Sequence, residues 1–255
     1  MIPKIIHYCW FGKNPLPNYA VKYIESWKKY FPGYEIKEWN ESNYDVHKIP
    51  YISEAYNAKK YAFVSDYARF DILYEYGGIY FDVDVEVIKP FGKILDDTGF
   101  MGVERMGAIA AGLGVGCNAG LGVVKEILEH YKGERFLCSD GINEYNLKTV
   151  VSRVTEIFAK NGFDVKSNKI QKVADFTIYP SEYFAPKSFR TGITKITQNT
   201  YSIHHYDASW MDLNDIKNIE KIRKIKQLLG DNIFSIIISM IYLFFIDIFN
   251  FMKHR

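Results

Sequence analysis

The chain has 255 residues, of which 48% are hydrophobic, so it can bury one substantial core but is too short for two full-sized domains. Its formal net charge is +2 and neither half is strongly charged, which gives no electrostatic case for a nucleic-acid binder. Three cysteines without metal-ligand spacing indicate no disulfide framework and favour a reducing, cytoplasmic compartment. The first residues lack the basic and apolar regions of a secretory signal, and we expect none.

Hydrophobic runs and breaker residues predict alternating strands and helices along the chain. The expected elements are, in order, a strand over 4–10, a helix over 18–30, a strand over 34–39, a helix over 62–76, strands over 79–81 and 85–90, and a helix over 123–131. Gly77 and Gly78 should end the second helix, because glycine can adopt the left-handed conformation of a C-cap. The strand, helix, strand order with short connections favours an α/β fold with a mainly parallel sheet.

A glycine-rich loop precedes the last of these helices. Gly114, Gly116 and Ala119 match the spacing of a dinucleotide-binding fingerprint, with Asp140 near the place of a ribose-binding acid. The preceding residues, 104–111, are a poor strand and lie far from the start of the chain. We therefore prefer a close-packed loop on the substrate side to a Rossmann cofactor site.

The end of the chain differs in character from the rest. Residues 214–229 combine an apolar stripe with recurring lysines, which predicts a basic amphipathic helix. Residues 233–246 are almost wholly apolar, but at about 1.5 Å per helical residue they span roughly 21 Å, short of the ~30 Å hydrocarbon core. A helix lying in the membrane interface and a helix packed on the core or in an oligomer contact both stay open. We assign residues 1–213 to the main domain and 214–255 to this tail.

The most informative stretch is residues 65–84, SDYARFDILYEYGGIYFDVD, where a helix leads through two glycines into a short strand that ends in two carboxylates. On an extended chain, Asp82 and Asp84 would share one face at the carboxyl end of the strand, where open α/β sheets bind ligands. An isolated pair of this kind is most often a solvated turn. Asp66 and Arg69, spaced i and i+3 on one helix face, favour a site instead. Paired carboxylates suit Mg²⁺ or Mn²⁺, which bind through one or two carboxylates plus substrate phosphates.

A second polar cluster, HHYDASW, lies at residues 204–210. One of its two histidines can complete a metal site, although an isolated histidine is more often a core residue. Ser209 and Trp210 offer hydrogen-bond donors to phosphate oxygens. Trp10, at the end of the first strand, can stack on a nucleotide base or serve as a core aromatic.

Together, the start IPKIIHYCWFG, the acidic segment and HHYDASW resemble glycosyltransferase family 32, which includes bacterial capsule enzymes and yeast mannosyltransferases. They are also similar to the catalytic domains of the large clostridial glucosylating toxins. The resemblance spans about residues 2–210 and does not cover the tail. It implies a single GT-A type domain that transfers a hexose from a UDP- or GDP-hexose with retention of configuration, using Mn²⁺ or Mg²⁺.

The resemblance also implies roles for individual residues. Trp10 would stack on the base, and Asp66 and Arg69 would hold the donor sugar and its phosphate. Asp84 would bind the metal directly. The residues implied in donor binding are Cys9, Trp10, Ser65, Asp66, Arg69, Tyr80, Asp82, Ser209 and Trp210. Those implied in catalysis are Asp66, Arg69, Asp82 and Asp84, and those implied in metal binding are Asp82, Asp84 and His205, with His205 chosen over His204.

No acid in the sequence is an obvious nucleophile, which favours a front-face mechanism in which the departing phosphate oxygen accepts the proton of the acceptor. The acceptor is expected to be a glycan or a lipid-linked oligosaccharide of capsular or surface polysaccharide synthesis. The basic and apolar tail would then hold the enzyme peripherally on the inner face of the membrane. Two alternatives stay open: a metal-dependent phosphohydrolase or nucleotidyltransferase, and a non-catalytic carbohydrate-binding relative.

Overall fold

The computed structural model describes most of the chain up to residue 207. The described residues are 1–104, 107–138, 144–189, 191–207, 217, 221, 223 and 224. The chain divides into two units, Met1–Pro186 with Lys195–Trp210, and Lys187–Thr194 with Met211–Arg255. Most of the predicted tail lies outside the described residues, as do Asp140, Ser209 and Trp210. Within the described part of the chain, every helix is too short or too polar to cross a membrane.

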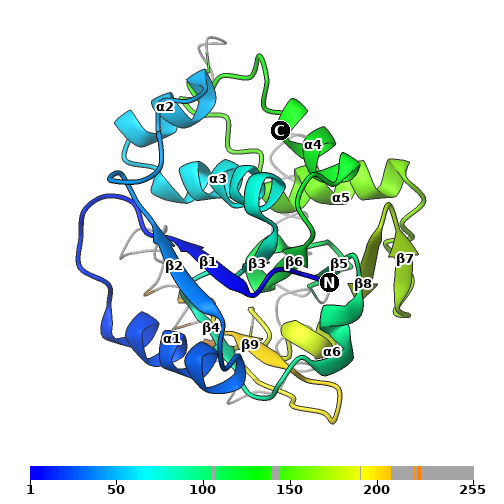
Figure 1. Ribbon diagram of the computed structural model, residues 1–255. Helices are drawn as coiled ribbons and strands as arrows, with labels where there is room; N and C mark the ends of the chain where they lie inside the picture. The colour runs from blue at the N-terminus through cyan, green and yellow to red at the C-terminus, as the bar shows by residue number, and fades with distance from the viewer. Residues whose placement is uncertain are drawn as a thin grey trace, which may run out of the picture. The chain divides into compact units, whose positions relative to one another are not determined.

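A seven-stranded sheet lies at the centre of the larger unit (Figure 1). Its strands are, in spatial order, β2 (Glu35–Trp39), β1 (Ile5–Cys9), β3 (Gly78–Tyr80), β6 (Val115–Cys117), β5 (Gly99–Gly102), β8 (Phe176–Tyr179) and β7 (Gln171–Val173). β1 is parallel to β2 and β3, and β5 is parallel to β8, whereas β6 and β7 run antiparallel to their neighbours. Five of the seven strands therefore share one direction, which confirms the predicted α/β fold with a mainly parallel sheet.

Two hydrophobic cores flank this sheet, because successive side chains of a strand point to opposite faces. Tyr8 and Ile79 belong to one core, and their neighbours Cys9 and Tyr80 belong to the other. The face of Cys9 is covered by α2 (Pro50–Asn57), α3 (Tyr61–Tyr76), α4 (Gly122–Glu129) and α5 (Val150–Lys160). The face of Tyr8 is covered by α1 (Asn18–Tyr30), α6 (Ser181–Phe184), the 3₁₀ turn η1 (Gly92–Asp96) and a separate antiparallel pair, β4 (Val85–Val87) with β9 (Ser202–His204).

Helix α1 has the bounds that the sequence predicts. Its buried residues Ala20, Tyr23, Ile24 and Trp27 recur at i, i+3, i+4 and i+7, so they form one apolar stripe toward the core. Lysines in its last turn interact favourably with the negative end of the helix dipole. The buried stripe therefore fixes which face of α1 lies against β4.

Helix α3 stops at Gly77, as predicted. Gly77 has φ +64°, and a Cβ there would lie 2.9 Å from the carbonyl oxygen of Cys117, so only glycine fits. The Gly77 carbonyl accepts a hydrogen bond from Nε2 of His7 (2.9 Å), while Nδ1 of His7 accepts one from the Trp39 indole (3.1 Å). Burial lowers the pKa of His7 to about 4, which keeps this ring neutral. The turn from α3 into β3 is thus anchored to β1 and β2.

The predicted glycine-rich loop is closely packed. Gly116 lies within β6, where a Cβ would stand 2.2 Å from the Phe100 ring. β6 pairs antiparallel with β3 and β5 rather than forming the first strand of a parallel β-α-β unit. These contacts support the preference for a packed loop over a dinucleotide site.

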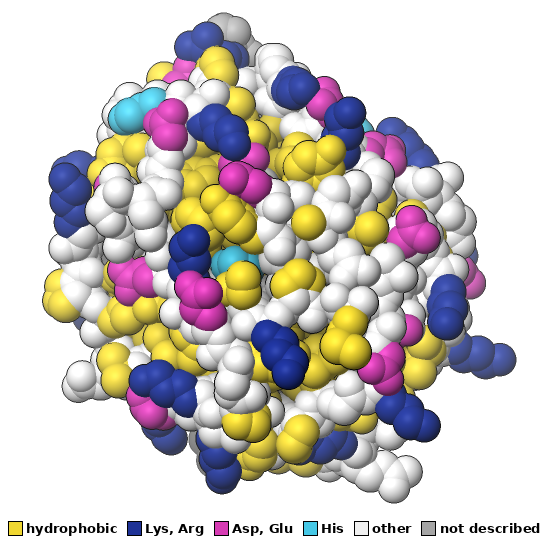
Figure 2. All heavy atoms as spheres, viewed as in Figure 1, with side chains coloured by type: hydrophobic (Ala, Val, Ile, Leu, Met, Phe, Trp, Pro, Cys, Tyr) yellow, Lys and Arg dark blue, Asp and Glu magenta, His cyan; other side chains and the backbone are white. Residues whose placement is uncertain are grey.

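Side chains of both charges are interspersed with hydrophobic ones on the face of the molecule shown in Figure 2. Several described ion pairs are exposed and local, such as Lys28 with Glu25 and Lys132 with Glu129. Pairs of this kind contribute about 0–1 kcal/mol each. The stability of the fold therefore rests on the two cores and not on surface charge.

Candidate active site

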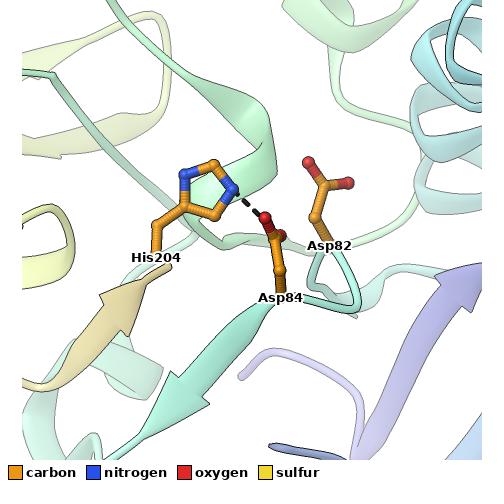
Figure 3. A group of neighbouring side chains, drawn as sticks. All are labelled: Asp82, Asp84 and His204. Carbon is orange, nitrogen blue, oxygen red and sulfur yellow. Dashed lines mark ion pairs between the residues drawn. The ribbon is translucent and has the colours of Figure 1, made fainter. Parts of the chain in front are cut away.

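The acidic pair lies just beyond β3, in a turn. β3 ends at Tyr80 and β4 begins at Val85, and the Val85 N–H donates to the carbonyl oxygen of Asp82 (3.1 Å). The two carboxylates are therefore placed by this turn and not by the strand alternation that the sequence predicts. They nevertheless converge with His204, since each of the three side chains offers a ligand atom and these atoms lie within 4.8 Å of one another (Figure 3).

Asp84 and His204 form a close pair at the start of β4 and the end of β9 (Figure 3). Nε2 of His204 lies 3.0 Å from Oδ1 of Asp84, and Oδ2 of Asp84 accepts the N–H of Asp207 (3.0 Å). Burial alone would raise the pKa of Asp84, but His204 and the Asp207 N–H outweigh it and hold the pKa below its usual value. Burial alone would lower the pKa of His204, but Asp84 raises it above its usual value. Each member of the pair therefore favours the charged form of the other.

The structure brings His204, rather than the predicted His205, to the acidic pair. His205 pairs through Nε2 with Oε2 of Glu86 (2.8 Å), and its ring stacks on Tyr23 with centroids 4.5 Å apart and planes 4° from parallel. Adjacent residues at a strand end point to opposite sides, so only one of the two histidines can face Asp84. Asp84 precedes β4 and lies in the turn, so its side chain is free of the strand alternation and meets His204, although the register pairs His204 with Val85.

Arg69 is buried between two carboxylates. Nη2 lies 2.9 Å from Oδ1 of Asp66 and 3.4 Å from Oδ1 of Asp82, while Nε donates to the carbonyl oxygen of Ser65 (3.1 Å). Burial opposes the charge of Arg69, but Asp82, Tyr80 and Asp66 outweigh it and raise the pKa, so the guanidinium stays protonated. The helical i, i+3 spacing of Asp66 and Arg69 thus produces the contact that the sequence indicates.

Asp66 has the most perturbed carboxyl group of the cluster. Burial raises its pKa to about 6, although Arg69 acts in the opposite direction. The N–H of Val150, the first residue of α5, also bonds to this carboxyl group. Asp66 therefore changes charge in a mildly acidic range where ordinary carboxyl groups are ionised.

Cys9 and Tyr80 are buried next to Arg69 and Asp82. Their exposed fractions are 7% and 1%, so neither offers much surface to a donor. The Arg69 guanidinium lies 4.9 Å from the centre of the Tyr80 ring, and the Tyr80 hydroxyl bonds to the Asp82 carboxylate. Burial raises the pKa of the Cys9 thiol to about 12, which keeps it protonated. Both residues were predicted at the donor, and the structure places them where they support Arg69 and Asp82.

Trp10 lies at the same end of the sheet as the acidic pair. β1 and β3 are parallel, with His7 in register with Tyr80, so Trp10 follows β1 at the same sheet edge where the acidic pair follows β3. The indole N–H donates to the carbonyl oxygen of Asn14 (2.7 Å), which fixes a half-buried ring. The predicted Ser65 is one turn before Arg69, and its hydroxyl donates to the carbonyl oxygen of Tyr61 (3.2 Å).

Two further residues near the site were not identified from the sequence. Gly112 accepts the N–H of Asp82 at its carbonyl oxygen (3.2 Å), and it belongs to the loop that the glycine pattern placed on the substrate side. Glu104 is a carboxyl group whose burial raises its pKa and whose charge acts on His204. No pattern in the sequence distinguishes Glu104 from the other acidic residues.

An acidic pair, a histidine and a buried arginine thus meet beyond the end of β3. Residues 17–101 match the glycosyltransferase sugar-binding region containing the DXD motif. This match confirms the predicted resemblance to glycosyltransferase family 32 over that part of the chain.

Curated relatives match part of the chain. Inositol phosphoceramide mannosyltransferase 1 of Schizosaccharomyces pombe is 30% identical over 111 residues, which cover 39% of this chain and 33% of the relative. An uncharacterised glycosyltransferase of Acanthamoeba polyphaga mimivirus is 34% identical over 105 residues, which cover 37% of this chain and 40% of the relative. The matched stretch thus spans less than half of each relative. Among solved structures, the PaToxG glycosyltransferase aligns with 62% of this chain and 69% of its own at 19% identity and a TM-score of 0.47.

Proposed function

We propose that the protein is a metal-dependent, retaining glycosyltransferase that transfers a hexose from UDP-hexose or GDP-hexose. The acceptor is a glycan or a lipid-linked oligosaccharide, and the pathway is capsular or surface polysaccharide synthesis. The observation that carries this proposal is the convergence of Asp82, Asp84 and His204 beside the buried Arg69. The match of residues 17–101 to a sugar-binding region supports it.

The residues present fit a divalent cation. Two carboxylates and an imidazole offer three ligand atoms within 4.8 Å, and Mn²⁺ and Mg²⁺ accept such ligands together with phosphate oxygens. Asp82, Asp84 and His204 would hold the metal. When bound, it would supply positive charge for the diphosphate that leaves the sugar.

The chain's own residues contribute the remaining charge and orientation. Arg69 is kept protonated inside the site, so its guanidinium can stabilise negative charge that develops on the leaving phosphate. Asp66 and Asp82 neutralise Arg69 on one side and offer acceptor oxygens to the hydroxyls of a hexose. The leaving phosphate oxygen takes the acceptor proton on the same face of the sugar, which gives retention.

The test is turnover of the protein after chelation and after addition of Mn²⁺. Asp84→Ala should abolish metal-dependent transfer while the fold persists, and Asp96→Ala, at an exposed carboxylate of η1, should leave transfer unchanged. The product decides between reaction classes, because transferred sugar supports the proposal and transferred nucleotide indicates a nucleotidyltransferase. Metal-independent turnover of Asp84→Ala at the wild-type rate would remove the metal assignment.

We further propose that the enzyme is cytoplasmic and associates with the inner face of the membrane through residues 214–255. The basic stripe of residues 214–229 and the apolar run of 233–246 support this, since lysines bind anionic lipids and an apolar face enters the interface. Deletion of residues 232–255 should move the protein from the membrane fraction to the soluble fraction. Unchanged fractionation would contradict the proposal.

A further inference from the structure

We propose that Gly112 is a positioning residue, whose missing side chain determines where the carboxylate of Asp82 lies beside Arg69. This inference rests on the proposed function, because it assigns to Gly112 the alignment of a residue that binds the metal and the donor sugar. Gly112 acts only through Asp82 and has no direct role in the reaction.

Gly112 is in close contact with Asp82 at both its backbone and its α-carbon. It is the middle residue of the buried 3₁₀ turn η2 (Ala111–Leu113), and its carbonyl oxygen accepts the Asp82 N–H at 3.2 Å. A Cβ at Gly112 would stand 2.0 Å from Oδ2 of Asp82 and 3.5 Å from Nη1 of Arg69. Even one methyl group therefore requires the Asp82 carboxylate to move.

Backbone conformation does not explain this glycine. Gly112 is not among the glycines with positive φ, so an alanine can adopt its backbone angles. Gly114, two residues later, differs, because it has φ +133° and a Cβ there would lie 2.7 Å from the Phe81 ring. Gly114 is thus explained by the fold, whereas Gly112 is explained by the carboxylate of Asp82.

The displacement should fall on Asp82 and not on Arg69. The Asp82 side chain is 30% exposed and can rotate toward solvent at the loss of its bond from the Tyr80 hydroxyl. The Arg69 side chain is 5% exposed and is also held by Asp66 and Ser65. Movement of Asp82 away from Gly112 lengthens its 3.4 Å contact with Arg69 and separates it from Asp84 and His204. Gly112→Ala therefore disturbs the geometry of the site, while the buried turn η2 keeps its packing.

The experiment compares Gly112→Ala, Asp82→Ala and the double variant with a matched control, Gly122→Ala. Gly122 is an exposed helix residue where a Cβ meets nothing within 4 Å. We expect Gly112→Ala to remain folded and to lose about 10–100-fold in kcat/KM for the donor, because a misplacement of about 1 Å can cost about 10²-fold. Gly122→Ala should match the wild type. In the Asp82→Ala background, Gly112→Ala should have no further effect, because the displaced group is absent.

A crystal structure of Gly112→Ala supplies a readout that is independent of activity. We expect the distance between the Asp82 carboxylate and Arg69 Nη2 to exceed its present 3.4 Å by about 1 Å or more. An unmoved Asp82, a wild-type kcat/KM, or effects of the two substitutions that multiply in the double variant would each overturn the inference. Failure of the proposed function is distinguishable, since it appears as a wild type without transfer, and the crystal structure then still decides the role of Gly112.

Discussion

The two adjacent histidines at the end of β9 should respond differently to substitution. His204→Ala removes a nitrogen 3.0 Å from Asp84, one of three ligand atoms in the candidate metal group. Loss of a residue that only hydrogen-bonds to a metal ligand lowers metal affinity about 10–100-fold, so loss of the ligand itself should lower it at least as much. His205→Ala removes an ion pair with Glu86, worth about 0–1 kcal/mol, and a ring stack on Tyr23, worth about 0.5–1.5 kcal/mol. It should therefore lower stability by about 0.5–2.5 kcal/mol and leave metal affinity unchanged.

The assay is titration of the chelated protein with Mn²⁺ by calorimetry, together with urea unfolding of each variant. The two variants control for each other, because they lie on the same strand end and remove the same side chain. Weakened Mn²⁺ binding in His205→Ala with unchanged binding in His204→Ala would refute the assignment of His204. Equal loss in both variants would show that the ends of β4 and β9 collapse together, which would refute the separation of their roles.

Three further predictions concern the surroundings of the site. Because burial raises the pKa of Asp66 to about 6, donor affinity should fall about tenfold for each pH unit below that value. Donor binding by the Asp66→Asn variant, measured across the same pH range, should not show this fall. In the wild type, the free energy of unfolding should decrease as the pH rises from 3.8 to about 6, because the folded state binds the extra proton in this range, and Asp66→Asn should not show this decrease. Glu41 accepts the N–H of Gly12 (2.7 Å) in the loop after β1, and a bond to a charged group is worth about 1.5–3 kcal/mol. Glu41→Ala should therefore weaken nucleotide binding about 10-fold or more without changing Mn²⁺ affinity. Equal nucleotide affinity would show that the loop is not part of the donor site. Arg153 is 1% exposed and pairs with Glu134 (2.7 Å). Arg153→Ala should lower the free energy of unfolding by about 3–5 kcal/mol and the Tm by about 6–20 °C. A Tm shift below about 2 °C would contradict its structural role.

Local features of the site could be predicted from the sequence. The i, i+3 spacing of Asp66 and Arg69 depends only on helix geometry, and their 2.9 Å contact follows from it. The glycine stop at Gly77 depends on one residue's backbone angles. The bounds of α1 follow in the same way from an apolar stripe that lies between Pro17 and the pair Pro32-Gly33. These predictions succeed because the interactions that determine them lie within a few residues.

Contacts between distant parts of the chain could not be predicted in this way. Choosing His204 over His205 requires the position of β9 relative to the turn before β4, two segments about 120 residues apart, and no local pattern supplies it. The contact of Gly112 with Asp82 depends on a buried loop whose path has no local sequence signature. The spacing of Asp82 and Asp84 correctly predicts that they lie close together, but the reason was wrong, since a turn rather than a strand joins them.

Helix α1 has a role in the site that its distance in sequence conceals. β4 and β9 pair over only three residues, too short a ribbon to be stable alone. The Trp27 indole donates to the carbonyl oxygen of Val85 (2.7 Å), and the Ser26 hydroxyl accepts the N–H of Val87 (2.9 Å). These bonds satisfy the edge of β4 that β9 does not pair, so α1 serves as its second neighbour. Because β4 pairs with β9, the packing of α1 also holds in place the ribbon that carries His204, whose Nε2 lies 3.0 Å from Asp84.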